Sequence, residues 1–483
     1  MLVVISDLHL GDGTTAASIP ASAFYLFAKR LRQDAHFASM RYGKYQPIEE
    51  LDVILMGDIL DPLHSTKWMF PLAGQEQHVT VDGQEHIRIT EPGDPNYIRP
   101  WSDINDPKFA PKLLEVVHAI LEENKEAMEI FRKLANGEFI DFDSIGTDGV
   151  RSSAPEDKVP LKVRFHYMVG NHDWYFHLKG PAFDQIRQLI IDTMGLSNTP
   201  APFPHDLHKL NPASPWEQDE SAELDRLFKE YKIFCRHGDC YDHFNFDVEK
   251  GRDTATMGDV FTMEVCNRYP EQLRRNSGIT LEIVDNMRYL TNVRPSLATP
   301  LWITGQIKKL SNEKKLLDIG ERQLRKIWND LADNFLTLDF VKEKDKFGID
   351  IVDKMQIAIK LSKLVSFETI DTLIYKLQNR GVSGSEHSFA DFALKEPAFM
   401  DDSARYIIYG HTHHHETVPL DFDTVGGNQI YFNSGTWHTF FDLARKDPKE
   451  KKFIPYKALT YITFYKETEH DERHFETWSG AYA

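Results

Sequence analysis

Short apolar runs, each ended by a glycine or a polar residue, recur along the chain. Their β-branched and aromatic side chains predict buried strands. These runs cover residues 2–5, 53–56, 163–169, 233–235, 406–409, 429–432 and 459–464. Apolar residues at a spacing near 3.6 predict a helix over residues 111–135. The mixture of strands and helices predicts an α/β fold.

A long segment near the middle of the chain has a different pattern. Within residues 246–396, helical spacing of apolar residues continues over 317–338, 351–359 and 370–377. Acidic and basic residues are equal in number there, so the net charge of −18 belongs to the rest of the chain. A chain of 483 residues is longer than one hydrophobic core usually supports. We therefore predict a discontinuous core, residues 1–245 and 397–483, and a mostly helical insertion, residues 246–396.

The connections between these elements carry turn residues. Asp82-Gly83 predicts a tight hairpin turn within residues 79–84. Residues 136–160, rich in Gly, Ser and Asp, and the proline-rich residues 197–216 predict long loops. Gly and Ser at residues 381–385 predict a hinge where the insertion ends.

Polar residues that can bind metals follow five of the predicted strands. The motifs are Asp7-Leu8-His9, Gly57-Asp58-Ile59-Leu60-Asp61, Gly170-Asn171-His172-Asp173, His237-Gly238-Asp239 and Gly410-His411-Thr412-His413. Ligands gather at the carboxyl ends of strands in open α/β sheets, so we expect these motifs to meet at one sheet edge. Carboxylate, imidazole and amide groups in this number can hold two divalent cations, which is the equipment for cleaving a phosphate ester.

Each motif has a plainer interpretation when it stands alone. Asp7-Leu8-His9 is typical of a strand-end turn, Gly-Asn-His-Asp of an Asx turn, and the histidines at 411 and 413 of an exposed pair. The ordered set of five is far more specific. Residues 433–436, Asn-Ser-Gly-Thr, predict either a phosphate-facing turn or a plain loop.

The order of the five motifs resembles that of the calcineurin-like metallophosphoesterase superfamily. The resemblance covers the core and leaves the insertion without a counterpart. It implies two facing mixed β-sheets flanked by helices, as a four-layer sandwich, around two metal ions. In the family pattern one metal would take Asp7, His9, Asp58 and His413. The other would share Asp58 as a bridge and take Asn171, His237 and His411.

The same resemblance implies the reaction. A hydroxide that bridges the two metals would attack phosphorus in line, and His172 corresponds to the family's catalytic histidine. We expect Asp173 to orient His172, and Asp61 to hold His9 or Asp7 from behind. The ligand types suit two divalent ions, with Mn²⁺ preferred and Fe, Zn or Ni as alternatives.

The substrate is less well defined by the sequence. The residues of the motifs Asp-Leu-His-Leu, His-Gly-Asp and Gly-His-Thr-His, and the position of the insertion after the fourth motif, resemble the UDP-2,3-diacylglucosamine pyrophosphatase branch. In that branch the insertion caps the site and binds acyl chains. His172 stands where that branch has Arg, and the insertion here is far longer. We predict a small phosphorylated substrate, a mono- or diester or a pyrophosphate, beneath a cap formed by residues 246–396. A nuclease and a non-catalytic scaffold are the alternatives.

Composition narrows the class of protein. The negative net charge and the lack of basic runs argue against nucleic acid as a partner. No apolar run approaches the roughly 18 residues of a membrane helix, and no signal peptide is recognisable. Cys235 and Cys240 flank His237, which raises the idea of thiolate ligands, but small buried cysteines are the favoured interpretation. Three cysteines suit a reducing cytoplasm, and the oligomeric state stays open.

Overall fold

A computed structural model gives the arrangement of most of the chain. It describes residues 1–146, 149–152, 154–208, 218–294, 298–313, 318–345, 388–423, 427–444, 446 and 452–481. The helices predicted over 351–359 and 370–377 and the hinge at 381–385 lie outside the described residues. So does the part of the 197–216 loop that falls on residues 209–216; its described part contains neither helix nor strand.

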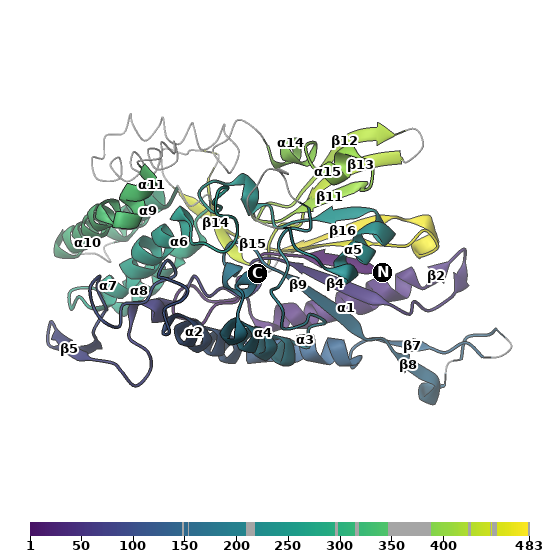
Figure 1. Cartoon of the computed structure of the whole chain (residues 1–483), viewed down its shortest axis with the longest axis horizontal. Helices are drawn as coiled ribbons and strands as arrows, with labels where there is room; N and C mark the ends of the chain where they lie inside the picture. The colour runs from purple at the N-terminus through teal and green to yellow at the C-terminus, as the bar shows by residue number, and fades with distance from the viewer. Residues whose placement is uncertain are drawn as a thin grey trace.

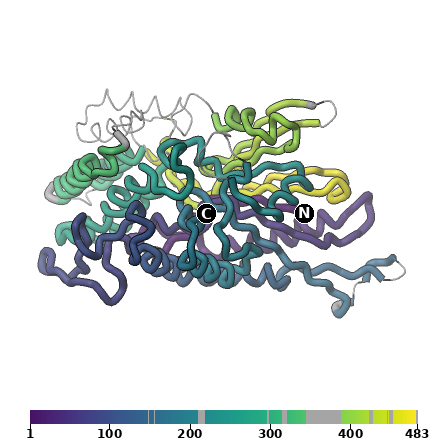
Figure 2. The backbone as a smooth tube through the Cα atoms, in the orientation of Figure 1, coloured from purple at the N-terminus to yellow at the C-terminus, as the bar shows by residue number. Residues whose placement is uncertain are grey.

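The first sheet contains six strands in the order β14-β15-β1-β4-β9, and β16 pairs with β15. Three neighbours run parallel: β1 (Leu2–Ile5), β4 (Leu51–Met56) and β9 (Val163–Met168). The other three strands are antiparallel to their neighbours: β14 (Thr439–Leu443), β15 (Phe453–Phe464) and β16 (Phe475–Ala481). Strands β1 and β15, from opposite ends of the chain, therefore lie side by side (Figure 2).

The second sheet contains four strands in the order β10-β11-β13-β12. Its parallel members are β10 (Ile233–Cys235), β11 (Tyr406–Tyr409) and β13 (Gly427–Asn433). Strand β12 (Glu416–Asp423) is antiparallel to β13. All seven predicted strands are present, and the chain is a mixed α/β protein (Figure 1).

Alternate residues of the first sheet enter two different hydrophobic clusters. Val3, Val53 and Phe165 pack with helices on one face. Val4 and Ile54 point the other way, into a cluster that also contains residues of β10, β11 and β13. Because both faces are covered, these strands read as continuous apolar runs.

Four helices cover the first sheet on the face away from the second (Figure 1). They are α1 (Ala21–Ala38), α2 (Phe109–Glu123), α3 (Lys125–Asn136) and α4 (Pro181–Met194). The prediction of a single helix over 111–135 is wrong, because the helix is interrupted at Asn124, between α2 and α3. Asn124, at the break, donates its side-chain amide to the carbonyls of Gly11 (2.7 Å) and Ile120 (2.8 Å). The hydrogen bond from Asn124 to Gly11, a tertiary contact, thus helps to end α2.

Shorter elements complete the core. The predicted Asp82-Gly83 hairpin is present as β5 (His78–Val81) and β6 (Gln84–Ile87). Residues 136–160 are not only loop, because they contain a second small hairpin, β7 (Asp141–Asp143) and β8 (Lys158–Pro160). Further core elements are β2 (Met40–Arg41), β3 (Lys44–Tyr45), α5 (Ala222–Tyr231) and α15 (Pro397–Met400). Helix α14 (Phe389–Ala393) belongs to the end of the insertion.

The described part of the insertion is mostly helical, and its helices other than α14 group at one end of the molecule (Figure 1). They are α6 (Met257–Phe261), a π-helix at Thr262–Asn267, α7 (Arg268–Arg274), α8 (Leu281–Arg288), α9 (Thr299–Asn312), α10 (Asp318–Thr337) and α11 (Asp339–Asp345). These helices pack around a hydrophobic cluster of their own. Among the residues with a described position, no helix has the length and apolar character needed to cross a membrane.

Candidate metal centre

The five predicted motifs meet at one place, but they do not come from one sheet. Three follow strands of the first sheet and two follow strands of the second, so the expectation of a single sheet edge is wrong. The two sets of strand ends are joined directly. His237 Nδ1–H donates to the carbonyl of Met56 at 3.0 Å, and the amide of His411 donates to the carboxylate of Asp7 at 3.1 Å.

One group of donor atoms comes from Asp7, His9, His413 and Asp58. His9 Nε2 lies 3.0 Å from His413 Nε2, 3.8 Å from Asp7 Oδ1 and 3.7 Å from Asp58 Oδ2. His413 Nε2 lies 3.4 Å from Asp7 Oδ1. Atoms that share an ion at about 2.1 Å lie roughly 3.0–3.4 Å apart at tetrahedral or octahedral angles. The two distances from His413 Nε2 fall within this range, and the two from His9 Nε2 to the carboxylates are slightly longer, so the four atoms surround a space close to the size that one cation needs.

A second group comes from Asp58, Asn171, His237 and His411. His237 Nε2 lies 3.2 Å from Asp58 Oδ2 and 3.2 Å from Asn171 Oδ1, and His411 Nδ1 lies 3.0 Å from the same amide oxygen. The oxygen Asp58 Oδ2 therefore belongs to both donor sets. A shared carboxylate oxygen is what two adjacent cations need between them.

Hydrogen bonds to the outer ring nitrogens orient three of these histidines. His9 Nδ1–H donates to Asp61 (2.8 Å), His237 Nδ1–H to the Met56 carbonyl (3.0 Å) and His411 Nε2–H to Asp242 (3.2 Å). In each ring the other nitrogen then directs its lone pair toward the donor set. This pairing of a ring N–H with a carboxylate or carbonyl is typical of metal-binding histidines.

The backbone at these positions is unusual. The left-handed region of φ is occupied by five predicted ligands: Asp7 (54°), His9 (46°), Asp58 (55°), His411 (66°) and His413 (64°). A left-handed conformation costs a non-glycine residue roughly 1–2 kcal/mol. Residues in such conformations cluster at functional sites, where the surrounding structure fixes them.

Three motif glycines, Gly57, Gly170 and Gly410, stand where no side chain fits, and the last two lie against carboxylates of the donor sets. A Cβ atom at Gly170 would collide with the Asp58 carboxylate and lie 2.8 Å from the His237 ring. A Cβ atom at Gly410 would lie 2.5 Å from Asp7 Oδ2. Glycine at these two positions lets the backbone approach the donor atoms closely.

The electrostatics of the centre favour positive charge. Burial opposes protonation of His9, but the hydrogen bond to Asp61 and the nearby carboxylates of Asp7 and Asp58 raise its pKa to about 9. Burial likewise opposes protonation of His237, and the carboxylates of Asp58 and Asp7 raise its pKa to about 10. The same carboxylates would attract metal cations.

An unpaired buried oxygen also fits a cation. Asp7 is fully buried, and its Oδ1 atom has no hydrogen-bond partner among the described residues. The other carboxylate oxygen accepts a short hydrogen bond from the Ser6 hydroxyl. A buried carboxylate oxygen without a partner is costly unless an ion compensates it. Asp7, His9 and His413 can converge on one ion, as can Asp7, Asp58 and His237.

The structure separates the two residues predicted to be catalytic. His172 is 9% exposed and its Nδ1–H donates to Asp61 at 3.1 Å. The Asp173 carboxylate points elsewhere: it accepts from the amides of Ile59 (2.9 Å) and Gly170 (2.6 Å) and from the Tyr167 hydroxyl (2.7 Å). The expectation that Asp173 orients His172 is therefore wrong. Asp61 holds His172, because it is the carboxylate within reach of the ring.

Burial and the nearby charge of Asp58 raise the pKa of Asp173 to about 6. Three hydrogen bonds tie its carboxylate to the loops on either side. Asp173 thereby connects the second and third motifs, which carry Asp58 and Asn171.

Several residues at the centre are absent from the motifs. His64 Nδ1–H donates to Asp61 at 2.7 Å, and burial lowers the pKa of His64 to about 4. The His438 ring lies 5.4 Å from the His9 ring. Arg294 comes from the insertion; burial lowers its pKa, while the carboxylates of Asp61, Asp7 and Asp58 act in the opposite direction. Only the i, i+3 spacing of Asp61 and His64 could have been noticed in the sequence.

Residues 433–436 form hydrogen bonds to the backbone of two motifs of the centre. Asn433 donates its side-chain amide to the Gly410 carbonyl (2.8 Å), and the Thr436 hydroxyl donates to the Asp7 carbonyl (2.8 Å). The hydroxyls of Ser434 and Ser6 are 2.6 Å apart. All three side chains are buried. This segment is a buried turn that fixes two ligand-bearing loops.

The cysteines are not part of the donor sets. Cys235, Cys240 and Cys266 are free and buried. Burial raises the pKa of Cys235 and Cys240 well above the ordinary thiol value. Both stay protonated, so the favoured interpretation of small buried cysteines is confirmed.

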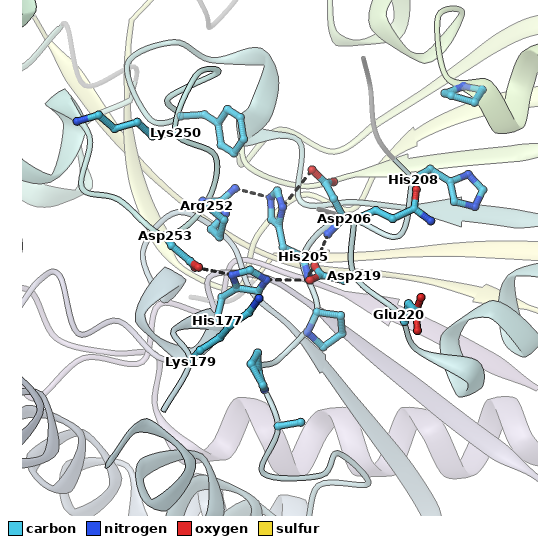
Figure 3. Close-up of a pocket in the computed structure, with 16 residues that line it drawn as sticks. His177, Lys179, His205, Asp206, His208, Asp219, Glu220, Lys250, Arg252 and Asp253 are labelled. Carbon is cyan, nitrogen blue, oxygen red and sulfur yellow. Dashed lines mark hydrogen bonds and ion pairs between the residues drawn. The ribbon is translucent and has the colours of Figure 1, made fainter. Parts of the chain in front are cut away.

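A network of buried charges lies behind the second donor set. The Arg252 guanidinium forms short contacts with Asp239 and His205 and donates to the Gly170 carbonyl at 3.3 Å. Arg252 and His205 also line a cavity of about 1350 Å³ (Figure 3). In this cavity His177 bonds to Asp219 (2.8 Å) and Asp253 (2.6 Å). The network fixes the loop that carries Asn171 without contacting the donor atoms.

Comparison with known proteins adds no relative: no family model, curated protein or solved structure matches the chain.

Proposed function

We propose that this protein is a binuclear metal-dependent phosphoesterase of the calcineurin-like type. The observation that carries the proposal is the Asp58 Oδ2 atom, which lies within both donor sets. The first set would be Asp7, His9, Asp58 and His413; the second would be Asp58, Asn171, His237 and His411. Divalent ions held there, with Mn²⁺ preferred, would activate a water molecule and offset the charge of a phosphate group.

The charge balance of the side chains supports an anionic substrate. Only two carboxylates, Asp7 and Asp58, contribute oxygen atoms to the two donor sets. A site with two divalent ions and two carboxylates stays net positive and attracts phosphate even in an acidic protein.

His172 is placed to assist the departure of the leaving group. Its Nδ1–H is held by Asp61, so its Nε2 atom is the one available to substrate. The ionised carboxylate of Asp61 stabilises the protonated ring, which gives its Nε2 proton to the departing oxygen. Nearby imidazoles hold the pKa of Asp61 well below its usual range despite burial, so the carboxylate remains charged.

The finer fold that we propose is the four-layer sandwich of that superfamily. The two sheets share one hydrophobic cluster, and four helices cover the outer face of the first sheet. Helices α5 and α14 contribute side chains to the shared cluster.

We propose in addition that the insertion caps the substrate site. Three contacts place it beside site loops. Asn267 donates to the Leu63 carbonyl (2.9 Å), Trp174 donates to Asp259 (3.2 Å), and the Phe389 ring lies 6.1 Å from the His411 ring. On the core side, Leu63 precedes His64, Trp174 follows Asp173, and His411 is itself a member of the second donor set.

The test combines metal analysis with hydrolysis of an aryl phosphate. The purified protein loaded with Mn²⁺ should contain two ions per chain and release nitrophenol from p-nitrophenyl phosphate. Asp58→Asn should lose at least one ion and reduce kcat/KM by roughly 100-fold or more. Asp82→Asn, in the turn between β5 and β6, is the matched control and should behave as the unmodified protein.

The result also separates the proposal from its rivals. Two bound ions with no hydrolysis of phosphomonoester or phosphodiester would indicate a scaffold. Cleavage of DNA with a steep salt dependence would indicate a nuclease. Either result would contradict the proposed function.

A further inference from the structure

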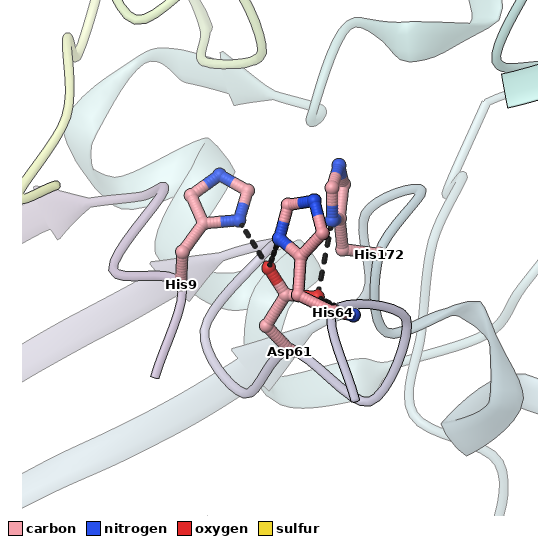
Figure 4. A group of neighbouring side chains, drawn as sticks. All are labelled: His9, Asp61, His64 and His172. Carbon is pink, nitrogen blue, oxygen red and sulfur yellow. Dashed lines mark hydrogen bonds and ion pairs between the residues drawn. The ribbon is translucent and has the colours of Figure 1, made fainter. Parts of the chain in front are cut away.

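The carboxylate of Asp61 accepts hydrogen bonds from three imidazole rings. Oδ2 accepts from His9 Nδ1 (2.8 Å) and from His64 Nδ1 (2.7 Å), and Oδ1 accepts from His172 Nδ1 (3.1 Å) (Figure 4). The backbone amide of His64 also donates to Oδ1 at 3.0 Å. Asp61 therefore fixes the positions of His64 and His172 together.

The three rings present their second nitrogen in the same direction. Figure 4 shows Nε2 of His9, His64 and His172 on the side away from Asp61. The Nε2 atom of His9 belongs to the first donor set, so this direction leads to the metal centre. The His64 and His172 rings are 4.8 Å apart, and the His9 and His172 rings are 4.6 Å apart. His64 thus stands beside the predicted proton donor and faces the same space.

These four side chains could themselves be imagined as a metal site. The hydrogen bonds argue against it. Each Nδ1–H points at an oxygen of Asp61 at 2.7–3.1 Å, so the direction in which that nitrogen would bind an ion is already occupied. The nitrogen that remains available on His64 is Nε2.

His64 offers a hydrogen-bond acceptor to this space. Its ring is buried, and its Nδ1–H donates to Asp61 at 2.7 Å. Burial also lowers the pKa of His64, so the ring is neutral with its hydrogen on Nδ1. In a neutral ring whose Nδ1 carries the hydrogen, Nε2 is an acceptor.

We infer that His64 binds the P–O–H group of a phosphomonoester and selects it over a diester. The inference rests on the proposed function. A monoester has three non-bridging oxygens, so two can face the metals and the third can carry a proton to His64 Nε2. A diester has no such hydroxyl, and its ester oxygen would oppose the lone pair of Nε2. Facing acceptors repel, and a buried acceptor without a partner is costly.

The test uses two substrates that differ by one methyl group on phosphate. These are p-nitrophenyl phosphate and methyl p-nitrophenyl phosphate, which share a leaving group. His64→Asn keeps an amide near the Nδ1 position, to bond Asp61, and removes Nε2. We expect kcat/KM for the monoester to fall at least about 10-fold and that for the diester to change less than about 3-fold.

Binding supplies a second readout that does not depend on turnover. The Kd of the Mn²⁺-loaded protein for inorganic phosphate, from titration calorimetry, should rise about 10-fold in His64→Asn with two ions still bound. His166→Gln is the matched control. Its Nε2 bonds Asp52 at 2.8 Å, and an amide at that position preserves the bond. This variant should alter neither readout.

The outcomes distinguish this inference from the proposed function. Hydrolysis of neither substrate by the unmodified protein would overturn the proposed function. Hydrolysis with equal losses on both substrates in His64→Asn, or with no loss on either, would overturn the role of His64 alone. Should His64→Asn fail to fold, His64→Ala, which also removes Nε2, takes its place with the same two readouts.

Discussion

Asp173 shows how a residue inside a predicted catalytic motif can hold the loop backbone and not the neighbouring histidine. Its carboxylate holds the amides of Ile59 and Gly170, and His172 turns to Asp61 instead. The sequence places Asp173 next to His172, but adjacent residues at a strand end often point in different directions.

We predict that Asp173→Asn weakens the fold more than the chemistry. An amide group cannot accept from both backbone N–H groups, and a buried unsatisfied donor costs about 1–3 kcal/mol. The free energy of unfolding, from chemical denaturation, should fall by that amount. On the folded protein, kcat/KM should change less than about 10-fold, whereas His172→Asn should lose roughly 100-fold or more. Equal losses of activity in both variants would restore Asp173 to a catalytic role.

The residues of the two donor sets could be predicted from sequence because their order and spacing are local properties. Each follows an apolar run, and all seven predicted ligands lie in the two donor sets. Arg294 and His438 were missed because long-range packing brings them to the centre, whereas His64 was missed although its spacing from Asp61 is local. Arg294 is the clearest example, since it belongs to the insertion.

At the scale of elements, buried strands were predictable and helix boundaries were not. Strand β4 reads as apolar because both of its faces are covered. The break between α2 and α3 depends on a hydrogen bond from Asn124 to Gly11, which lies far away in sequence. The division of the strands into two sheets likewise depends on pairing that no single run encodes.

The short helix Trp174–His177 follows the third motif and is tied to two other segments by an ion pair at each nitrogen of His177. Burial opposes the charge, but hydrogen bonds to Asp219 and Asp253 raise the pKa of His177 to about 9. The folded state therefore holds this proton more tightly than the unfolded state, whose ordinary value is 6.5. The stabilisation is complete below that value and is lost as pH rises through about 9.

We predict that the unfolding free energy falls between pH 7 and pH 10 and that His177→Gln removes part of this slope. The difference in unfolding free energy between the unmodified protein and His177→Gln should shrink by about 2 kcal/mol from pH 7 to pH 10. This value is reduced from the full effect of the pKa shift because Asp253 is partly exposed. Denaturation curves at several pH values, with metal content held constant, provide the measurement. Parallel pH profiles for the two proteins would show that the ion pairs contribute nothing.

At the scale of the whole molecule, the insertion is joined to the core along much of its length. Arg99 in the core is 0% exposed and bonds Glu264 of the insertion at 3.1 Å. Val293 pairs with Phe441 of β14. Deleting the insertion would leave Arg99 buried without its carboxylate, so a deletion would disturb the core as well as the cap. A point variant is the sharper test of a cap function.

We predict that Arg294→Gln raises KM for a phosphomonoester roughly tenfold and leaves kcat and metal content unchanged. The charges of Asp61, Asp7 and Asp58 oppose the lowering of the Arg294 pKa by burial. The guanidinium would attract a bound phosphate in the ground state as well as in the transition state, so its loss should change KM and not kcat. Steady-state kinetics and metal analysis provide the measurements. Arg322→Gln, on helix α10, is a matched control within the insertion. Loss of metal or of kcat in Arg294→Gln would contradict a role in substrate binding.

The left-handed backbone of the ligand-bearing turns limits how this centre could be redesigned. Asn, Asp and His are the residues other than glycine that enter this conformation most readily. Replacing Asp58 or His413 by Glu or Cys, to change metal preference, would alter the ligand. It would also make the left-handed backbone conformation at that position less favourable. Exchanges among Asp, Asn and His keep the turn and change only charge and ligand type. The metal preference of the proposed centre should therefore be easier to adjust within those three residues than outside them.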